Sequence, residues 1–337
     1  MAHPELSPDQ RNHIYIASGS THPELASEIA EFMNLKLGPV EGKRFPNSEL
    51  YIRYEESVRG DHVFAIQTLA AMDGRSVNDS LMELVLMVDA AKRASASDIT
   101  VVAPYLAYSR QDRKARGREP ISAAAVIRML QSAGADRLVS IDMHSPQTQA
   151  TFNGPFDHLT AEGLIQAALK SEVGTNNEEY VIVSPDGGRA KVAEDYAEVL
   201  EVDVVHMPKS RDRHDSSKIT RPSRIDGVDG RTSLLVDDMI DTAGTLVSAA
   251  EALKKSGAKR IIVAATHGLF SYPALDRLKD APIDEIIVTD TVPLDDAREA
   301  LGDKLHVLSS APLIAEALIE IAIHGSVSKI FKDRNHQ

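Results

Sequence analysis

The sequence contains no cysteine and no tryptophan, and its remaining aromatic residues are eight tyrosines and seven phenylalanines. The absence of cysteine excludes disulfides, thiolate metal sites, iron–sulfur clusters and cysteine nucleophiles. So few aromatic side chains also make a base-stacking surface for single-stranded nucleic acid unexpected. A reducing compartment such as the cytoplasm fits this composition.

Long apolar runs are absent as well. No apolar run is long enough for a membrane-spanning helix, which needs about 18 residues or more. The first twenty residues lack the basic stretch followed by an apolar stretch that is typical of a secretory signal. We therefore expect a cytoplasmic chain that has no membrane partner.

Positive charge is in deficit. The chain has 37 Lys and Arg against 50 Asp and Glu, which gives a formal net charge of −13 at pH 7. A field of this sign repels nucleic acid and anionic membranes, so neither is an expected partner. Any anionic ligand would have to be gathered by local basic segments.

The amino-acid composition is otherwise that of a globular α/β protein, and 337 residues suit two domains. Short apolar runs predict buried parallel strands, and apolar residues between them recur at helical spacing, as at Leu81, Leu84 and Val88. The alternation of strand and helix predicts the α/β class. The apolar runs lie at 13–18, 62–67, 99–105, 138–144, 180–186, 232–238, 260–267 and 285–291.

One helix-to-strand unit recurs. Residues 92–105 align without gaps on residues 254–267, which favours duplication of two similar domains. Residues 132–144 show a similar pattern, however, and a helix that ends in Gly-Ala before a buried strand is common in α/β proteins. Gly, Pro and polar residues interrupt the pattern near the middle of the chain, so we expect domains at 1–158 and 159–337.

Ionisable residues follow several of the predicted strands: His144, Asp186, Asp237 and Asp238. Ligands of parallel sheets bind beyond the carboxyl ends of the strands, so these side chains are expected to converge. Each one alone is equally explained as the polar end of a strand. His144 alone suits a base, a metal ligand or a buried histidine, and no zinc-binding pattern accompanies it. Together, His144 and Asp186 would suit a Mg²⁺ that a nucleotide carries on its phosphates.

Residues 234–253 combine a buried strand, two adjacent carboxylates and a run of small residues that opens an amphipathic helix. Small residues let backbone amides approach an anion, and the helix dipole favours negative charge at that point. The pattern predicts a phosphate cradle for a sugar phosphate, with the acids gripping vicinal hydroxyls. A plain capped helix, with Asp241 or Thr242 as its N-cap, is the alternative. That alternative leaves Asp237 and Asp238 without a role.

Two segments run against the acidic net charge. Residues 206–231 contain seven basic and four acidic residues, and residues 108–118 contain five basic residues and one acidic residue. Such loops are commonly just solvated. Because the first one is long and directly precedes the phosphate cradle, we expect it to be a cationic lid over a polyphosphate.

Six segments of the sequence are highly specific when they occur together in this order. The last one, at 236–245, would by itself indicate only the wider phosphoribosyltransferase-like superfamily. The combination resembles the ribose-phosphate pyrophosphokinase family over roughly residues 13–331. The segments are FPNSELYIRYEESVRGDHVFAIQ (45–67), NDSLMELVLMVDAAKRASA (78–96), YSRQDRKARGREPISA (108–123), DMHSPQTQATFNGPFDHL (142–159), VSPDGGR (183–189) and VDDMIDTAGT (236–245).

The resemblance implies two phosphoribosyltransferase-like α/β domains related by duplication, each a mostly parallel sheet flanked by helices. It also implies that the diphosphoryl group of MgATP is transferred to the 1-hydroxyl of ribose 5-phosphate. The products would be AMP and phosphoribosyl diphosphate (PRPP), a precursor for nucleotide and histidine biosynthesis. The family further implies Mg²⁺ as the metal, a homo-oligomer that is usually a hexamer, and ADP and phosphate as candidate effectors.

The matched motifs assign a role to each candidate residue. The resemblance implies that ATP is held by Phe45, Asn47, Glu49, Arg110, Gln111 and Asp112, the first three supplied by a neighbouring subunit. It implies that ribose 5-phosphate is held by Arg211, Asp237, Asp238, Asp241, Thr242, Ala243, Gly244 and Thr245. It implies that His144 and Asp186 position Mg²⁺ and that Lys209 and Arg211 are the catalytic cations of the lid.

The chain departs from the family pattern at three places. Ser48 stands where the family usually has glycine, and Pro46 stiffens the approach to it. If that position needs a positive φ, ATP affinity or the subunit contact would change. VSPDGGR lacks the commoner spacing of its motif, and Lys329 with Ile330 replaces Tyr and Leu in a segment that the family uses for allosteric control.

Two alternatives to an active enzyme remain. One is a catalytically silent regulatory homologue, which the retained candidate cations and metal ligands argue against and Ser48 leaves open. The other is a PRPP-consuming phosphoribosyltransferase. Such an enzyme is usually a single domain and needs neither Arg110–Asp112 nor a lid lysine at 209.

Overall fold

The computed structural model describes residues 6–72, 74–184, 190–207 and 225–331. The expected ligand Asp186 and the expected catalytic cations Lys209 and Arg211 lie outside these described residues. Among the residues described, no helix has both the length and the apolar character needed to cross a membrane.

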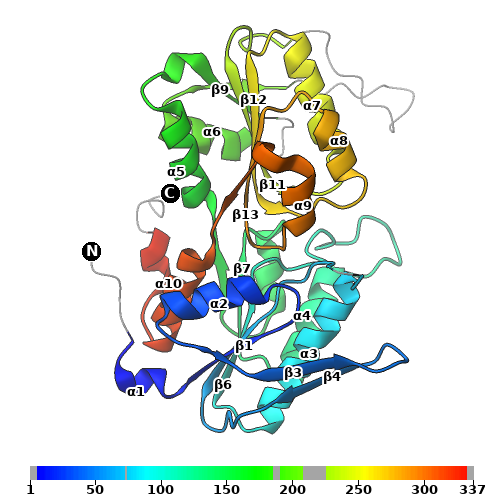
Figure 1. The fold of residues 1–337 in the computed structure, drawn as a ribbon, viewed down its shortest axis with the longest axis vertical. Helices are drawn as coiled ribbons and strands as arrows, with labels where there is room; N and C mark the ends of the chain where they lie inside the picture. The colour runs from blue at the N-terminus through cyan, green and yellow to red at the C-terminus, as the bar shows by residue number, and fades with distance from the viewer. Residues whose placement is uncertain (1–5, 73, 185–189, 208–224, 332–337) are drawn as a thin grey trace. The chain divides into compact units, whose positions relative to one another are not determined.

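The first compact unit is built around a six-stranded parallel sheet in the order β2-β1-β5-β6-β7-β8. Helix α2 packs beside α10, and α3 packs beside α4 (Figure 1). The strands are β1 (Ile14–Ser18), β2 (Leu37–Gly38), β5 (His62–Ile66), β6 (Asp98–Ala103), β7 (Arg137–Ile141) and β8 (Phe156–Leu159). The helices are α1 (Pro8–Arg11), α2 (Pro23–Phe32), α3 (Val77–Arg93), α4 (Ser122–Ala133), η1 (Pro146–Thr151), α10 (Ala311–Ala322) and η4 (Val327–Phe331).

The core of this unit is apolar and fully buried. The fully buried side chains include Ile16 and Phe64 on the strands and Leu25, Leu84 and Ile127 on α2, α3 and α4. Leu84 belongs to the helical spacing found in the sequence, so the periodic apolar face of α3 is the face that the helix buries.

The second compact unit contains another six-stranded parallel sheet, in the order β10-β9-β11-β12-β13-β14. Its core includes Ile182, Leu234 and Ile262 from the strands, with Leu169 and Tyr196 from the helices. The strands are β9 (Tyr180–Ser184), β10 (Asp203–His206), β11 (Thr232–Ile240), β12 (Arg260–Gly268), β13 (Glu285–Thr289) and β14 (Leu305–Leu308). The helices are α5 (Glu162–Val173), η2 (Asn177–Glu179), α6 (Ala190–Leu200), α7 (Gly244–Lys255), α8 (Ala274–Asp280), α9 (Asp295–Leu301) and η3 (Gly302–Lys304).

The two sheets have the same strand order, which confirms the expected α/β fold of two similar halves. The gapless alignment of 92–105 on 254–267 joins β6 to β12, and both are fourth in their sheets. All eight expected strands are present. The described residues contain six further strands that the sequence analysis missed. Four are edge strands of two to four residues, and the other two, β3 and β4, contain no apolar run longer than three residues.

The division of the chain differs from the expected boundary at 158/159. One unit comprises Met1–Thr160, Thr291–Pro293 and Ser309–Gln337, and the other comprises Ala161–Asp290 and Leu294–Leu308. The chain therefore returns to the first unit near its end. The mostly apolar helix α10 buries its surface there against α2, and Ser309 Oγ donates a 3.0 Å hydrogen bond to Glu28 Oε2.

A two-stranded antiparallel ribbon also belongs to the first unit. It consists of β3 (Val40–Arg44) and β4 (Leu50–Tyr54), and β4 packs on α3. In Figure 1 the ribbon crosses α3, and its turn extends beyond the helix. The residues expected to contact ATP at 45–49 make up this turn.

Candidate active site

The ribbon turn is closed by backbone hydrogen bonds. Phe45 N–H donates to Glu49 O at 2.8 Å, and Ser48 N–H donates to Phe45 O at 2.8 Å. Pro46 suits the second position of such a turn because its ring restricts φ, and Asn47 Oδ1 accepts the Glu49 N–H at 3.3 Å. Phe45 is 42% exposed. The structure therefore presents the three expected ATP contacts on one exposed turn.

Ser48 has a φ of 72°, in the left-handed region. A residue with a Cβ is strained there by about 1–2 kcal/mol relative to glycine. Short hairpin loops commonly place one residue in this conformation, and glycine is the usual choice. The departure noted in the sequence thus falls on a position that does need a positive φ.

The segment after β6 carries Arg110, Gln111 and Asp112. Gln111 is fixed against the start of α4, because Ser122 Oγ donates to its Oε1 at 2.6 Å and the Ala123 N–H donates to its backbone oxygen at 3.2 Å. Arg110 is exposed. This segment leaves strand β6 and joins α4, so its three polar residues lie at the carboxyl edge of the sheet.

Asp112 is linked to the loop that carries His144. Ser145 Oγ donates a 2.6 Å hydrogen bond to Asp112 Oδ2. This bond lowers the pKa of the Asp112 carboxyl, and the charges of Arg113 and His144 act in the same direction, so the group is ionised at neutral pH. Two expected site segments are thereby brought together in the first unit.

His144 is exposed, so its interpretation as a buried core histidine is wrong. Its loop is held from behind by His158 on β8, whose Nε2 accepts the Met143 N–H at 2.9 Å. Burial lowers the pKa of His158, which favours the neutral ring that this acceptor role requires. Asp142, with a φ of 36°, turns the chain between the strand and the loop.

The basic segment 108–118 is organised around one carboxylate. Glu119 Oε2 accepts the backbone N–H groups of Ala115 and Arg116, each at 2.8 Å. The four basic side chains between 113 and 118 are exposed. Their local positive charge therefore lies next to Asp112 and is available to an anionic ligand.

The second unit contains the predicted phosphate cradle. Asp237 and Asp238 are the sixth and seventh residues of β11, both half-buried, and the Asp238 N–H donates to Asp237 Oδ1 at 2.8 Å. The chain then turns through Asp241–Ala243 into α7, which starts at Gly244. All the expected ribose 5-phosphate residues of this segment are thus contiguous at the carboxyl end of β11.

The N-cap of α7 is Ala243, in the left-handed conformation with a φ of 57°, and it makes no side-chain cap hydrogen bond. Neither Asp241 nor Thr242 therefore occupies the N-cap position of this helix. Helices that bind anions direct their first backbone N–H groups at the ligand. The small, left-handed Ala243 at the start of α7 fits the close backbone approach that a phosphate cradle needs.

Arg277 supports this turn and was not found from the sequence. Its Nη1 donates to the backbone oxygen of Thr242 at 2.8 Å from α8, and a Cβ at Gly244 would lie 3.2 Å from the same nitrogen. No motif singles out Arg277. Ser145 and His158 lie within the segment 142–159 quoted above. Their roles could not be predicted from it, because their contacts depend on how neighbouring strands and loops are arranged.

The donors that the structure describes suit Mg²⁺ only as partners of a ligand's phosphates. Among the residues described, no group of three or more His, Asp or Glu side chains could hold a metal by itself. Ionised Asp112 and nearby His144 offer oxygen and nitrogen donors in the first unit. Mg²⁺ commonly takes one or two protein ligands and completes its shell with phosphates and water.

Comparisons with known proteins cover both halves of the chain. A family model described as the N-terminal domain of ribose phosphate pyrophosphokinase matches residues 14–134, and one described as a phosphoribosyl synthetase-associated domain matches residues 214–332. Ribose-phosphate pyrophosphokinases of Caldanaerobacter subterraneus and Streptomyces avermitilis are 45% and 43% identical to the chain over 321 and 317 residues. These alignments cover 95% and 94% of this chain and 98% and 95% of the relatives.

A solved structure agrees with the sequence comparison. The crystal structure of phosphoribosylpyrophosphate synthetase from Mycobacterium smegmatis is 41% identical to the chain and superposes with a TM-score of 0.84. The match covers 93% of this chain and 100% of that one.

Proposed function

This chain belongs to the ribose-phosphate pyrophosphokinase family, and from that premise we propose which of its residues carry the family's reaction. The chain is a ribose-phosphate diphosphokinase, which transfers the diphosphoryl group of ATP to the 1-hydroxyl of ribose 5-phosphate and yields PRPP and AMP. Phosphoryl transfer of this kind depends mainly on alignment of the two substrates and on stabilisation of charge.

The second unit binds ribose 5-phosphate in this proposal. The backbone amides at the turn before α7 receive the 5-phosphate, helped by the hydroxyls of Thr242 and Thr245. Asp237 and Asp238 hold the ribose hydroxyls. The paired carboxylates near the end of β11, followed by a turn of small residues into the N-terminus of α7, are the observation that carries the assignment.

The first unit supplies the ATP side. Arg110, Gln111 and Asp112 bind the nucleotide, supported by the Ser145 and Ser122 hydroxyls that fix two of them. Phe45, Asn47 and Glu49 reach a nucleotide from the exposed ribbon turn of a neighbouring subunit. Phe45 is suited to cover a purine ring because a flat aromatic face gains from such stacking.

His144 and Asp186 would hold Mg²⁺ together with the phosphates of ATP. The ion would supply neutralisation of the charge that develops on the transferred group. This chain's own part is to keep His144 at the loop tip, which the contacts of Ser145 and His158 do. Lys209 and Arg211 are the proposed catalytic cations.

The cellular setting is also part of the proposal. The protein is a cytoplasmic homo-oligomer, a hexamer by analogy with the family, and ADP and phosphate are its candidate effectors. Neither nucleic acid nor a membrane is a partner, in keeping with the net charge of −13.

One assay tests the whole proposal. Purified protein is incubated with ribose 5-phosphate, MgATP and phosphate, and the nucleotide product is identified by chromatography. AMP formed in equal amount with PRPP supports diphosphoryl transfer. ADP would indicate an ordinary kinase, and no nucleotide product would favour a silent homologue or a PRPP-consuming enzyme.

A further inference from the structure

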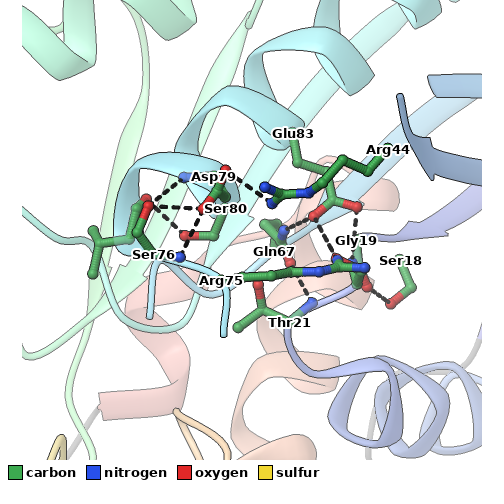
Figure 2. Close-up of polar contacts among 12 residues, drawn as sticks. Ser18, Gly19, Thr21, Arg44, Gln67, Arg75, Ser76, Asp79, Ser80 and Glu83 are labelled. Carbon is green, nitrogen blue, oxygen red and sulfur yellow. Dashed lines mark hydrogen bonds and ion pairs between the residues drawn. The ribbon is translucent and has the colours of Figure 1, made fainter. Parts of the chain in front are cut away.

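The ribbon formed by β3 and β4 approaches α3 at three levels, with a polar contact at each end. Tyr54 Oη, at the base of the ribbon, donates to the Met87 backbone oxygen at 3.2 Å. In the middle of the ribbon, a Cβ on Gly42 would lie 3.6 Å from Glu83 Oε1. At the turn end, Arg44 Nη2 lies 2.9 Å from Asp79 Oδ1 (Figure 2).

The spacing of these contacts matches the geometry of the two elements. The helix positions are 79, 83 and 87, four residues apart on one face, and four helical residues rise about 6 Å. The ribbon positions are 44, 42 and 40, where Val40 is the cross-strand partner of Tyr54. They are two residues apart, and two residues of a strand rise about 6.6 Å. These similar spacings let one face of the ribbon contact successive turns of α3.

The anchor at the turn end is held rigidly by the helix itself. Asp79 Oδ2 accepts the Ser76 N–H at 2.7 Å and the Ser76 hydroxyl at 2.8 Å, which completes the capping box of α3. The other carboxylate oxygen, Oδ1, therefore points to Arg44 in a fixed direction (Figure 2). An ion pair loses less conformational entropy when one partner is already immobilised.

Arg44 directly precedes the turn. It pairs across the ribbon with Leu50, so its backbone and that of Leu50 are the two ends from which residues 45–49 project. An isolated two-stranded ribbon is only marginally stable in water, and this one contacts α3 mainly along β4. Without the Arg44–Asp79 pair, the ribbon would keep its packing on α3 along β4 but would lose the polar contact next to the turn.

We propose that Arg44 and Asp79 form a positioning pair for nucleotide binding: the pair ties the ribbon to α3 so that the turn at 45–49 is presented to ATP in one orientation. This inference rests on the proposed role of that turn in binding ATP. Arg44 itself acts through the turn and does not touch the substrate. Asp79 uses Oδ2 for the helix cap and Oδ1 for Arg44, and it therefore couples the start of α3 to the turn.

The test compares Arg44→Met and Arg44→Lys with wild type, since neither change disturbs the Ser76–Asp79 capping box. We expect Arg44→Met to raise the KM for ATP about three- to fivefold, the size of one ion pair, with kcat and the KM for ribose 5-phosphate within twofold. The KM for ATP of Arg44→Lys should lie between those of wild type and Arg44→Met, because an ammonium group keeps the charge but not the planar two-donor geometry of the guanidinium. Hydrogen exchange of the amides at 44–50 should quicken in the same order.

Lys43→Met is the matched control. Lys43 neighbours Arg44 but is paired within the ribbon, 3.2 Å from Glu41 Oε1 and over the Tyr51 ring. It should leave the KM for ATP unchanged. An Arg44→Met enzyme with unaltered ATP KM and unaltered exchange would overturn the inference, as would an equal rise in both KM values, which indicates general damage.

Phe45→Ala separates this inference from the proposed function. If Phe45→Ala raises the KM for ATP and Arg44→Met does not, the positioning pair alone is refuted. If Phe45→Ala leaves the KM for ATP unchanged, the turn does not bind the nucleotide, and the proposed ATP contacts and the inference are both refuted.

Discussion

The carboxylate of Glu83 accepts the backbone N–H of Ser20 at 3.2 Å, although 63 residues separate the two in the chain. The same carboxylate accepts the Ser20 hydroxyl and the Gln67 amide, each at 2.6 Å, and Gln67 in turn accepts the Thr21 N–H at 3.2 Å (Figure 2). Arg75 hydrogen bonds to the Ser20 hydroxyl from the exposed side. This cluster joins the ends of β1 and β5 to α3.

Removal of the Glu83 carboxylate should destabilise the first unit. The side chain is only 8% exposed, so Glu83→Ala leaves three donors without their acceptor in a nearly dry site. We expect a loss of about 2–4 kcal/mol in the free energy of unfolding, measured by urea titration. Glu31→Ala, an exposed change on α2, is the control and should shift stability by less than about 0.5 kcal/mol.

Ser48→Gly should stabilise the ribbon turn. Glycine adopts the φ of 72° without the Cβ strain, which offsets its greater entropy in the unfolded chain. We expect a rise in Tm of about 1–3 °C by calorimetry, and slower hydrogen exchange at the turn. Ser48→Val should act in the opposite direction, and a Tm that falls for both variants would contradict the strain argument.

The half-buried His62 should make stability depend on pH. Burial is the largest cause lowering the pKa of His62, which stacks on Phe64 and contacts Thr100 Oγ1 at 2.8 Å. Because the folded-state pKa lies below that of the unfolded chain, about 6.5, the unfolded state takes up the proton first as pH falls. Stability is thus full above about pH 6.5 and decreases below it, by at most about 1.4 kcal/mol per pH unit for this group.

His62→Gln removes that titration while an amide can still reach Thr100. Unfolding free energies at several values from pH 7.5 to pH 5 should fall less steeply in the variant than in wild type. A residual slope is expected, because burial also lowers the pKa of His158. Identical slopes in the two proteins would show that His62 does not titrate on unfolding.

Arg277 should support ribose 5-phosphate binding without contacting the nucleotide. Arg277→Met removes the hydrogen bond that holds the Thr242 backbone oxygen at the cradle. We expect the KM for ribose 5-phosphate to rise about fivefold, the effect of roughly 1 kcal/mol, with the KM for ATP unchanged. Lys279→Met on the same helix is the control, and a similar rise there would point to general disturbance of α8.

Lys209→Ala should abolish most of the rate while leaving substrate binding nearly intact. A cation that stabilises the transferred phosphates in the transition state contributes about 10³ to 10⁵ in kcat in comparable reactions. Steady-state kinetics with both substrates measure this, and a near-normal kcat would refute the assignment. The roles of Lys209, Arg211 and Asp186 stay predictions, since these residues lie outside the part of the chain that the structure describes.

The sequence alone determined the class of fold and the strands that form the two sheet centres, and it supplied the segments proposed to carry the chemistry. Buried parallel strands and amphipathic helices leave a periodic apolar pattern along the chain, and the proposed phosphate cradle lies within one segment, from Asp237 to Thr245. Local patterns of this kind can be recognised from the sequence alone.

Only the tertiary structure decided which residues far apart in the sequence contact one another. The bond between Glu83 and Ser20, the support of the His144 loop by His158, and the return of α10 to the first unit leave no periodic trace, because each joins groups whose pairing depends on strand order and side-chain direction. The positive φ of Ser48 and the register of the ribbon on α3 likewise follow from packing in three dimensions. A sequence states which groups exist, and the fold decides which of them meet.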